Sequence, residues 1–129
     1  MEFPDNLFYT KDHEWVKIEG NIATIGITDY AQEQLGDIVF TDLPAKDQEF
    51  HKEDTYGVVE SVKSVSDCLA PVSGKVIDIN DSLAENPAII NESPYDEGWM
   101  VRLEMTNPQE TSTLLSAKAY EAYVNEEAG

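Results

Sequence analysis

The sequence predicts a mainly β fold, a two-sheet sandwich or flattened barrel with short helices and a helical tail. Short runs of β-branched and aromatic residues recur between turn-forming Gly, Pro and Asn residues, and this spacing is typical of sandwich and barrel strands. Similar patterns precede and follow Lys63, which lies near the midpoint between Trp15 and Met105. Two similar halves indicate two sheets related by a pseudo-twofold axis, and the connection that joins them is expected to protrude.

Length and composition are consistent with one domain. The chain has 129 residues, of which 41% are hydrophobic, and this is enough to bury a single core without staples. We therefore expect one domain over residues 1–129, with a β body at about 7–106 and a C-terminal helical segment at about 108–127. The chain has one cysteine, Cys68, which excludes an intrachain disulfide.

The charge of the chain limits its partners. The 26 acidic residues against 8 basic ones give a formal net charge of −18. This charge argues against binding to nucleic acid, because the phosphates would be repelled. It fits a protein that meets partners through their basic surfaces, although acids that only keep the protein in solution explain the charge equally well.

Neither a membrane segment nor a targeting segment is expected. No apolar run approaches the ~18 residues that a membrane helix needs. The first residues, MEFPDNLFYTKDHEW, contain no basic segment followed by an apolar one and are not rich in Arg and Ser, unlike signal and transit peptides. A cytoplasmic protein is therefore expected, and a mature mitochondrial form stays open.

The first half of the chain is predicted to hold a hairpin, a short helix and a strand. Branched residues on both sides of Glu19-Gly20-Asn21 indicate a β-hairpin with its turn there. Thr28 can cap a helix from about Asp29 to Leu35, and Gly36 can end it. Residues 38–40 form the next predicted strand.

The second half is predicted to be β until the tail. Two strands flank Lys63, and a turn at Ser73-Gly74 leads into a strand that reaches Ile79. The polar segment 82–98 is predicted as loop with one helical turn, and Trp99–Met105 as the last strand.

The tail carries helix start signals. The run Asn107-Pro108-Gln109-Glu110 places an N-cap residue, a proline at N1 and an acid at N3. The apolar stripe that follows predicts one or two helices packed on the β body, with a break and a new cap at Ser116.

Lys63 is the candidate functional residue, within TYGVVESVKSVSD (Thr55–Asp67). Residues 61–64 lack Gly, Pro, Asn and Asp, so a turn there must be a type I variety that accepts ordinary residues. An exposed lysine amine is protonated at neutral pH, and the nearby acids Glu60 and Asp67 stabilise that charge. A catalytic amine is therefore disfavoured. The residues alone leave open a modification site and an ordinary solvated lysine.

Other reactive residues form no recognisable site. The spacing of His13, His51 and Cys68 matches neither a metal site nor a catalytic triad, and Cys68 is expected to be a small buried residue. The acids between Asp42 and Asp54 lack the ligand spacing of a calcium loop. We therefore expect neither a catalytic site nor a metal site.

Several blocks of the sequence resemble the glycine cleavage system H protein family. The blocks are VVESVKSVSD followed by APVSG, NPAIINESPYDEGWM and, in the first half, HEWV and ATIGITDYAQEQLGDIVF. The similarity runs from about Leu7 to the C-terminal helix. Glu60, three residues before the lysine, and Gly74, eleven after it, also match the family pattern, and the resemblance implies that they help recognition of the lysine hairpin.

The resemblance implies a barrel-sandwich hybrid fold of the biotinyl/lipoyl type and a lipoyl group in amide linkage on Lys63. Glu14 and Asp67 match positions that contact the loaded lipoyl arm in a surface cleft, although a surface acid on a strand and a turn acid are the plainer alternatives. The family often has a serine where this chain has Asp12, which leaves the contact at that position open.

The implied function is that of a carrier that is not itself an enzyme. In the family, glycine decarboxylase (P protein) places the aminomethyl group of glycine on the arm. Aminomethyltransferase (T protein) passes that carbon to tetrahydrofolate, and dihydrolipoamide dehydrogenase (L protein) reoxidises the dithiol. The implied partners are these three enzymes and a lipoate ligase or lipoyltransferase, and we expect a monomer.

Four alternatives stay open beside this assignment. A biotin carrier typically has methionines beside the lysine, where this chain has Val62 and Ser64. The lipoyl domain of a 2-oxoacid dehydrogenase typically has an aspartate before the lysine and no long helical tail. A protein that relays lipoate to other lipoyl domains would use the same lysine. An unmodified acidic binding module would leave the lysine free.

Overall fold

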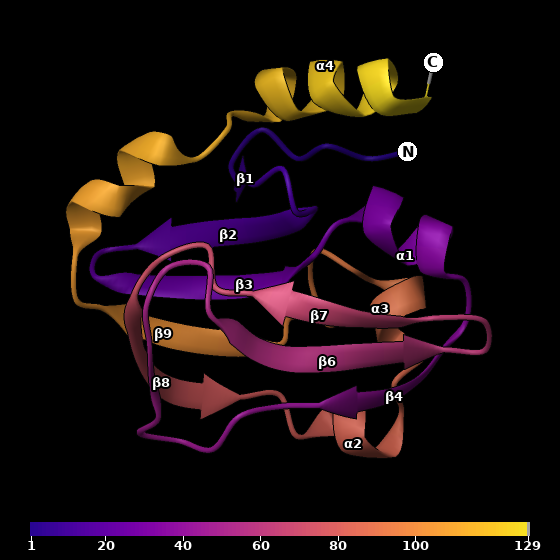
Figure 1. Ribbon diagram of the computed structural model, residues 1–129, viewed down its shortest axis with the longest axis horizontal. Helices are drawn as coiled ribbons and strands as arrows, with labels where there is room; N and C mark the ends of the chain where they lie inside the picture. Colours follow the sequence, from indigo (N-terminus) through magenta and orange to yellow (C-terminus); the bar gives the residue numbers. More distant parts are fainter. Residues whose placement is uncertain (129) are drawn as a thin grey trace.

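The computed structural model describes residues 1–128, which form two antiparallel sheets (Figure 1). Sheet A has the strand order β1-β2-β3-β9-β8-β5, and sheet B has the order β4-β6-β7. The strands of sheet A, in that order, are Phe8–Tyr9, Glu14–Glu19, Ile22–Ile27, Val101–Met105, Gly74–Ile79 and Glu49–Phe50. The strands of sheet B are Ile38–Asp42, Thr55–Ser61 and Val65–Leu69. The predicted two-sheet β fold is confirmed, with sheets of unequal size that do not close into a barrel within the described residues.

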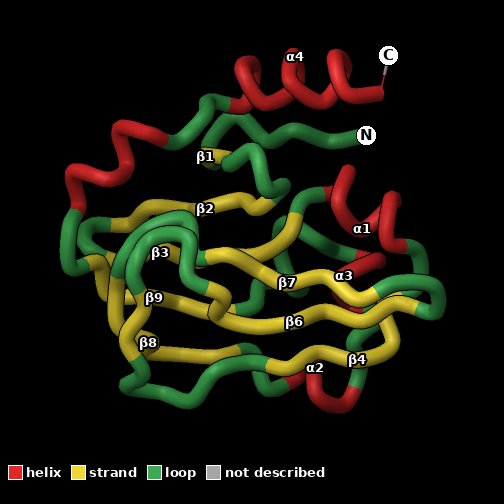
Figure 2. The backbone as a smooth tube through the Cα atoms, viewed as in Figure 1, coloured by secondary structure: helices red, strands yellow, loops and turns green. Residues whose placement is uncertain are grey.

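Short helices lie around the ends of the sheets (Figure 2). They are α1 (Asp29–Leu35), α2 (Ser82–Glu85), α3 (Ile89–Glu92), the 3-10 helix η1 (Pro108–Thr113) and α4 (Ala117–Ala128). Helices α1 and α3 lie at the end of the molecule where the β6–β7 turn projects, and α4 lies over the N-terminal segment (Figure 1). None of the helices described here is both long and apolar enough to cross a bilayer.

The local signals of the first half form the elements that they predict. The β2–β3 hairpin turns at Gly20, whose φ of 61° a glycine adopts without strain. The Thr28 hydroxyl accepts a hydrogen bond from the Ala31 N–H at 3.2 Å and caps α1. The helix ends at Gly36, which has a φ of 83° and donates its N–H to the Gln32 carbonyl at 2.9 Å.

Several details of the second half differ from the prediction, and the last strand, β9, begins at Val101 instead of Trp99. Gly74 is the first residue of β8, paired with Met105 and Phe50, so the predicted turn at Ser73-Gly74 is wrong for Gly74. The polar segment holds two short helices, α2 and α3, instead of one helical turn. The tail begins as a 3-10 helix in which the side chain of Asn107 makes no capping bond.

The break at Ser116 is where the sequence predicts it. The Ser116 hydroxyl accepts the Ala119 N–H at 3.1 Å, and α4 begins at Ala117. Helix α4 then packs on β1 and the N-terminal segment, where the rings of Tyr120 and Tyr9 stack with their centroids 4.7 Å apart.

The core has two parts. The larger part lies between the sheets, and its most buried members include Val16, Ile25, Val59, Val76, Leu83, Ile90 and Leu103. The smaller part lies between sheet A and α4 and contains Leu7, Tyr9, Trp15, Ala117, Tyr120 and Val124. The second part anchors the N-terminal segment and the C-terminal helix to the same strand, β2, so the two chain ends support one edge of the body.

Gly26 makes room for Trp15, which is 1% exposed and donates its indole N–H to the Pro94 carbonyl at 2.8 Å. A Cβ at Gly26 would lie 2.7 Å from two atoms of that ring. We therefore expect Gly26→Ala to displace the indole and lower the free energy of unfolding by about 1–3 kcal/mol, the usual cost of overpacking. Urea unfolding and tryptophan emission measure the two effects.

Gly20→Asn is the matched control. A Cβ at Gly20 would meet no neighbouring atom within 4 Å, and asparagine tolerates a positive φ. We expect this variant to stay within about 0.5 kcal/mol of the wild type. Equal stability and equal emission for Gly26→Ala and the wild type would contradict the steric argument.

Candidate functional site

Lys63 lies in the turn between β6 and β7, with its side chain exposed. The turn is closed by the Ser61 N–H, which donates to the Ser64 carbonyl at 2.7 Å. The Ser61 hydroxyl accepts the N–H of Ser64 at 3.0 Å and that of Lys63 at 3.3 Å. Neither Val62 nor Lys63 is among the described residues with positive φ, which excludes turn types I′, II and II′. Ser61 therefore supplies the local hydrogen bonds that Asn or Asp usually provides in a turn.

A neighbouring loop supports the turn. The Val62 N–H donates to the Asp37 carbonyl at 3.1 Å. The Lys63 side chain passes Gly36 closely, since its Cε would lie 3.5 Å from a Cβ at that glycine. The ion pairs among the described residues do not include the Lys63 amine. The lysine is thus held at its backbone and free at its amine.

Glu60 and Asp67 flank the turn on the strands that carry it. Glu60 is half-buried on β6 and pairs with Val65, and Asp67 is exposed on β7 and pairs with Val58. Directly paired residues of antiparallel strands share a face, so both acids lie on the outer face of sheet B. Their positions are close to the turn, as the sequence predicts.

Glu14 is placed differently, because it is 1% exposed and lies between the two sheets. One carboxylate oxygen accepts the Tyr56 hydroxyl at 2.9 Å, and the other accepts the Leu69 N–H at 2.6 Å. Since Glu14 is on β2 of sheet A and both donors are on sheet B, the carboxyl group ties the sheets together. The alternative that Glu14 is a surface acid is therefore wrong.

The surroundings of Glu14 disfavour charge. Burial raises the pKa of Glu14 well above its usual range, and the hydrogen bonds from Tyr56 and Leu69 offset only part of this effect. Burial, followed by the nearby Glu14 carboxyl, also raises the pKa values of Tyr56 and Cys68. The region beneath β7 is therefore a dry, weakly polar interior that favours a protonated Glu14.

A surface pocket of about 270 Å³ lies between the β1–β2 connection, α1 and β7. It is lined by Asp12, His13, Tyr30, Ala31, Gln34, Leu35 and Ser66. Asp67 follows Ser66 directly but is outside this lining, and Glu14 lies deeper, two residues after Asp12. The pocket therefore brings together His13 and Ser66, the chain neighbours of the two predicted arm contacts. It lies beside α1, at the end of the molecule where the β6–β7 turn projects.

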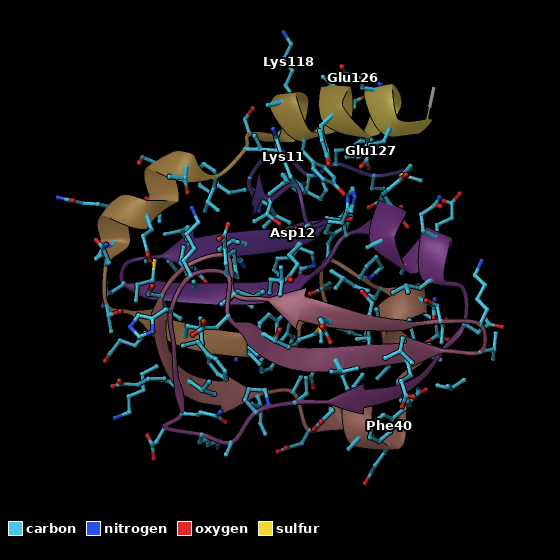
Figure 3. The ribbon with its side chains drawn as sticks, viewed as in Figure 1. Lys11, Asp12, Phe40, Lys118, Glu126 and Glu127 are labelled. Carbon is cyan, nitrogen blue, oxygen red and sulfur yellow. The ribbon has the colours of Figure 1, made fainter. Side chains whose placement is uncertain are left out.

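His13 fixes one wall of this pocket, with a φ of 67°. Its Nδ1 lies 2.9 Å from the Tyr120 hydroxyl, and its Nε2 lies 3.1 Å from a carboxylate oxygen of Glu127. Figure 3 shows Glu127 on α4 above the β1–β2 connection, which carries Asp12. The C-terminal helix thus holds the pocket wall in position through a histidine whose role the sequence does not reveal.

The remaining candidate residues have structural surroundings. A Cβ at Gly74 would lie 2.7 Å from the Glu104 carbonyl oxygen, so sheet packing alone explains this glycine. Cys68 is 2% exposed, which confirms the expected small buried residue. His51 is exposed and lies 3.7 Å from Asp54. In the described part of the chain, no three His, Cys, Asp or Glu side chains are grouped to hold a metal.

Comparison with known proteins agrees with this arrangement. The sequence model of the family described as "Glycine cleavage H-protein" matches residues 7–127. The chain belongs to the glycine cleavage H-protein family. It is 51% identical over 126 residues to the glycine cleavage system H protein of Staphylococcus epidermidis, covering 98% of this chain and 100% of that protein.

A solved structure supports the fold. The crystal structure of a glycine cleavage system H protein from Mycobacterium marinum is similar to this chain with a TM-score of 0.83 and 34% identity. The match covers 98% of this chain and 99% of that one. The family assignment made from the sequence blocks is therefore confirmed, together with the two-sheet architecture.

Sequence reasoning missed the burial of Glu14 and the hydrogen bonds of Ser61. The sequence contains a signal for the burial of Glu14, because residues two apart along a strand lie on one face. Glu14 therefore shares the inward face of Val16 and Ile18. No comparable pattern marks Ser61, since its partners depend on the turn that it helps to form.

Glu14→Gln tests the buried carboxyl. The folded protein keeps a proton on Glu14 above the ordinary value of 4.5, where the unfolded chain loses it. The free energy of unfolding therefore falls as pH rises above that value, by at most about 1.4 kcal/mol per pH unit from this group. Glutamine keeps the shape and has no such loss, so we expect the variant to gain stability relative to the wild type between pH 5 and pH 8.

Urea unfolding of both proteins at the two pH values measures this gain. Glu19→Gln, at an exposed position of the same strand, is the control and should show little change with pH. A Glu14→Gln difference that stays constant from pH 5 to pH 8 would contradict the raised pKa.

Proposed function

We propose that this protein is the lipoylated carrier of a glycine cleavage system, with the lipoyl group in amide linkage on Lys63. The observation that carries the proposal is the exposed Lys63 on a turn that its own hydrogen bonds hold, in a chain that belongs to the H-protein family. The carrier is not an enzyme by itself. Its reactions take place in the active sites of its partners.

The residues present fit a lipoyl group. Lys63 is reachable on a projecting turn and its amine is free of ion pairs with described residues. Acylation would remove the lysine charge, and no described carboxylate is paired with that charge. The pocket beside α1 offers apolar groups from Ala31 and Leu35 and polar groups from Asp12 and Ser66, which suits an apolar arm with a polar cargo.

When bound, the lipoyl group supplies a disulfide that accepts the aminomethyl group of glycine as it opens. Tethering raises the effective concentration of this group at each partner site. We propose the P protein, the T protein and the L protein as the three partners that load, unload and reoxidise it. A lipoate ligase or lipoyltransferase attaches it, and the carrier acts as a monomer.

The protein's own residues protect the cargo in this proposal. The pocket wall formed by His13 and α1 would shield the arm from water. Asp67 follows the pocket-lining Ser66 but is exposed on the outer face of sheet B, where its carboxylate can accept a hydrogen bond from an ammonium group. Glu14 is buried directly after the pocket-lining His13, and it holds β7, which carries Ser66 of the lining, to sheet A.

The intact mass of the protein from its native host tests the attachment. We expect an increase of one lipoyl group in the wild type and none in Lys63→Arg, because arginine offers no acylatable amine. Lys118→Arg, at an exposed position of α4, should keep the full increase. Unmodified wild type from cells supplied with lipoate would contradict the proposal.

Reconstitution separates glycine cleavage from lipoate relay. The lipoylated protein mixed with P, T and L proteins, glycine, tetrahydrofolate and NAD is expected to release carbon dioxide from glycine and to form methylene-tetrahydrofolate. A protein that instead only donates lipoyl groups to other lipoyl domains would fail this reconstitution while keeping its mass increase.

Asp67→Asn tests the protective role. Loss of a charge-assisted hydrogen bond costs about 1.5–3 kcal/mol, so we expect the loaded protein, free of partners, to lose its aminomethyl group about tenfold faster or more. Asp42→Asn is the matched control, because Asp42 lies two strands away in the same cross-strand row of sheet B. An unchanged rate for Asp67→Asn, followed by mass spectrometry, would remove Asp67 from the site.

A further inference from the structure

Exposed apolar side chains are concentrated around the lysine turn. Seven large hydrophobic residues of the described chain are exposed, and four of them lie on β4 or at the β6–β7 turn. These four, which we call the hairpin patch, are Val39, Phe40, Val62 and Val65, with exposures of 53%, 51%, 71% and 63%. The others, Met1, Phe8 and Ile77, lie on separate elements.

The strand register joins the patch into one surface. Phe40 pairs with Glu60, and Glu60 pairs with Val65. Directly paired residues lie on the same face of a sheet with their Cβ atoms about 4.5–5.5 Å apart, so Phe40 and Val65 lie on the outer face on either side of Glu60. Val62 adjoins Lys63 in the turn itself.

A β-bulge allows two consecutive residues of β4, Val39 and Phe40, to be exposed together. Ile38 pairs with Ser61 and Phe40 pairs with Glu60, so β4 has one more residue than β6 over this step. The extra residue is Val39, and a bulge of this kind re-aims side chains that strict alternation would turn inward. Two consecutive apolar residues are therefore exposed on β4, while Ile38 before them is 3% exposed and belongs to the core. Figure 3 shows Phe40 on this strand.

Acidic residues surround the patch. Asp37 precedes β4 and is exposed, and the next cross-strand row of the outer face carries Asp42, Val58 and Asp67. With Glu60 between the apolar side chains, the surface has an apolar centre and an acidic border. In a chain of net charge −18, this surface matches a partner with an apolar contact area bordered by Lys and Arg.

We propose that the hairpin patch is the docking surface for the enzyme that acylates Lys63. This inference rests on the proposed function. The lysine side chain has only a four-carbon stem, so the enzyme's reacting atoms must come within that short reach of the turn. Val62 and Val65 lie within two residues of Lys63, or about 7 Å along an extended chain. The acylating enzyme therefore covers them, whereas enzymes that act at the far end of the finished arm are held away by its length.

The acylation itself defines what the docked enzyme supplies. The neutral amine of Lys63 attacks the carbonyl carbon of an activated lipoyl donor, an acyl-adenylate or an acyl thioester. The C–N bond forms as the C–O or C–S bond breaks, and the leaving group takes that electron pair. The lysine ammonium loses two protons in all, one before attack and one from the amide nitrogen. The patch only positions the amine for this step.

Acylation kinetics test the proposal. Phe40→Thr and Val65→Thr remove apolar surface, and the β-branched threonine still favours a strand. With a purified lipoate ligase, lipoate and ATP, we expect the double variant to raise KM for the carrier about tenfold or more, since buried apolar anchors dominate docking. We expect little change in kcat, because Lys63 itself is unaltered. Intact mass against time gives both constants.

Phe8→Thr and Ile77→Thr are the matched controls, because these residues are 40% and 39% exposed on β1 and β8. They are expected to leave KM within about twofold of the wild type. Val62→Thr, at the most exposed patch residue and outside any strand, keeps the test valid if the double variant unfolds in a circular dichroism check.

Three outcomes would overturn the proposal or its basis. A KM unchanged in the double variant and in Val62→Thr would overturn the docking surface while the function stands. A wild type that the ligase never acylates would overturn the proposed function itself. A wild-type dimer in sedimentation that becomes a monomer in the patch variants would assign the patch to a second copy of the chain.

Discussion

The hydrogen bonds of Ser61 are the constraint on which the functional end of this molecule depends. A turn made of Ser, Val, Lys and Ser has none of the residues that normally specify one. Ser61 closes it from within through the backbone and hydroxyl bonds to Ser64, and the Asp37 carbonyl holds it from outside through Val62. The lysine can then remain unpaired and exposed, because its side chain contributes little to the structure that presents it.

The buried carboxyl of Glu14 performs the equivalent task inside the body. It accepts donors from both strands of the lysine hairpin, Tyr56 on β6 and Leu69 on β7, and it belongs to the opposite sheet. Such a bridge is costly to charge and costly to leave unsatisfied, so it specifies one arrangement of the two sheets. This arrangement positions β7 on one side of the pocket beside α1. The contact between His13 and Tyr120 of α4 positions the other side.

Local features of this fold could be predicted from the sequence, and non-local ones could not. The Gly20 turn, the Thr28 cap and the break at Ser116 each depend on contacts within a few residues, and all three formed as predicted. Gly74 does not form the predicted turn, because its conformation is set by pairing with β5 and β9, far away in the sequence. The clustering of Phe40 with Val65 depends likewise on strand register. The sequence blocks shared with the H-protein family predict the family without these contacts, because they are local stretches of residues, and the family model confirms it.

The lysine turn is rigid before any partner binds, and ¹⁵N relaxation of its backbone amides tests this most directly. If the Ser61 and Asp37 hydrogen bonds hold the turn in solution, the order parameters of Val62, Lys63 and Ser64 should be close to the value of about 0.85 found in rigid backbone. Order parameters below about 0.6, the range of flexible segments, would contradict the account, because the lysine would then be carried by a mobile loop.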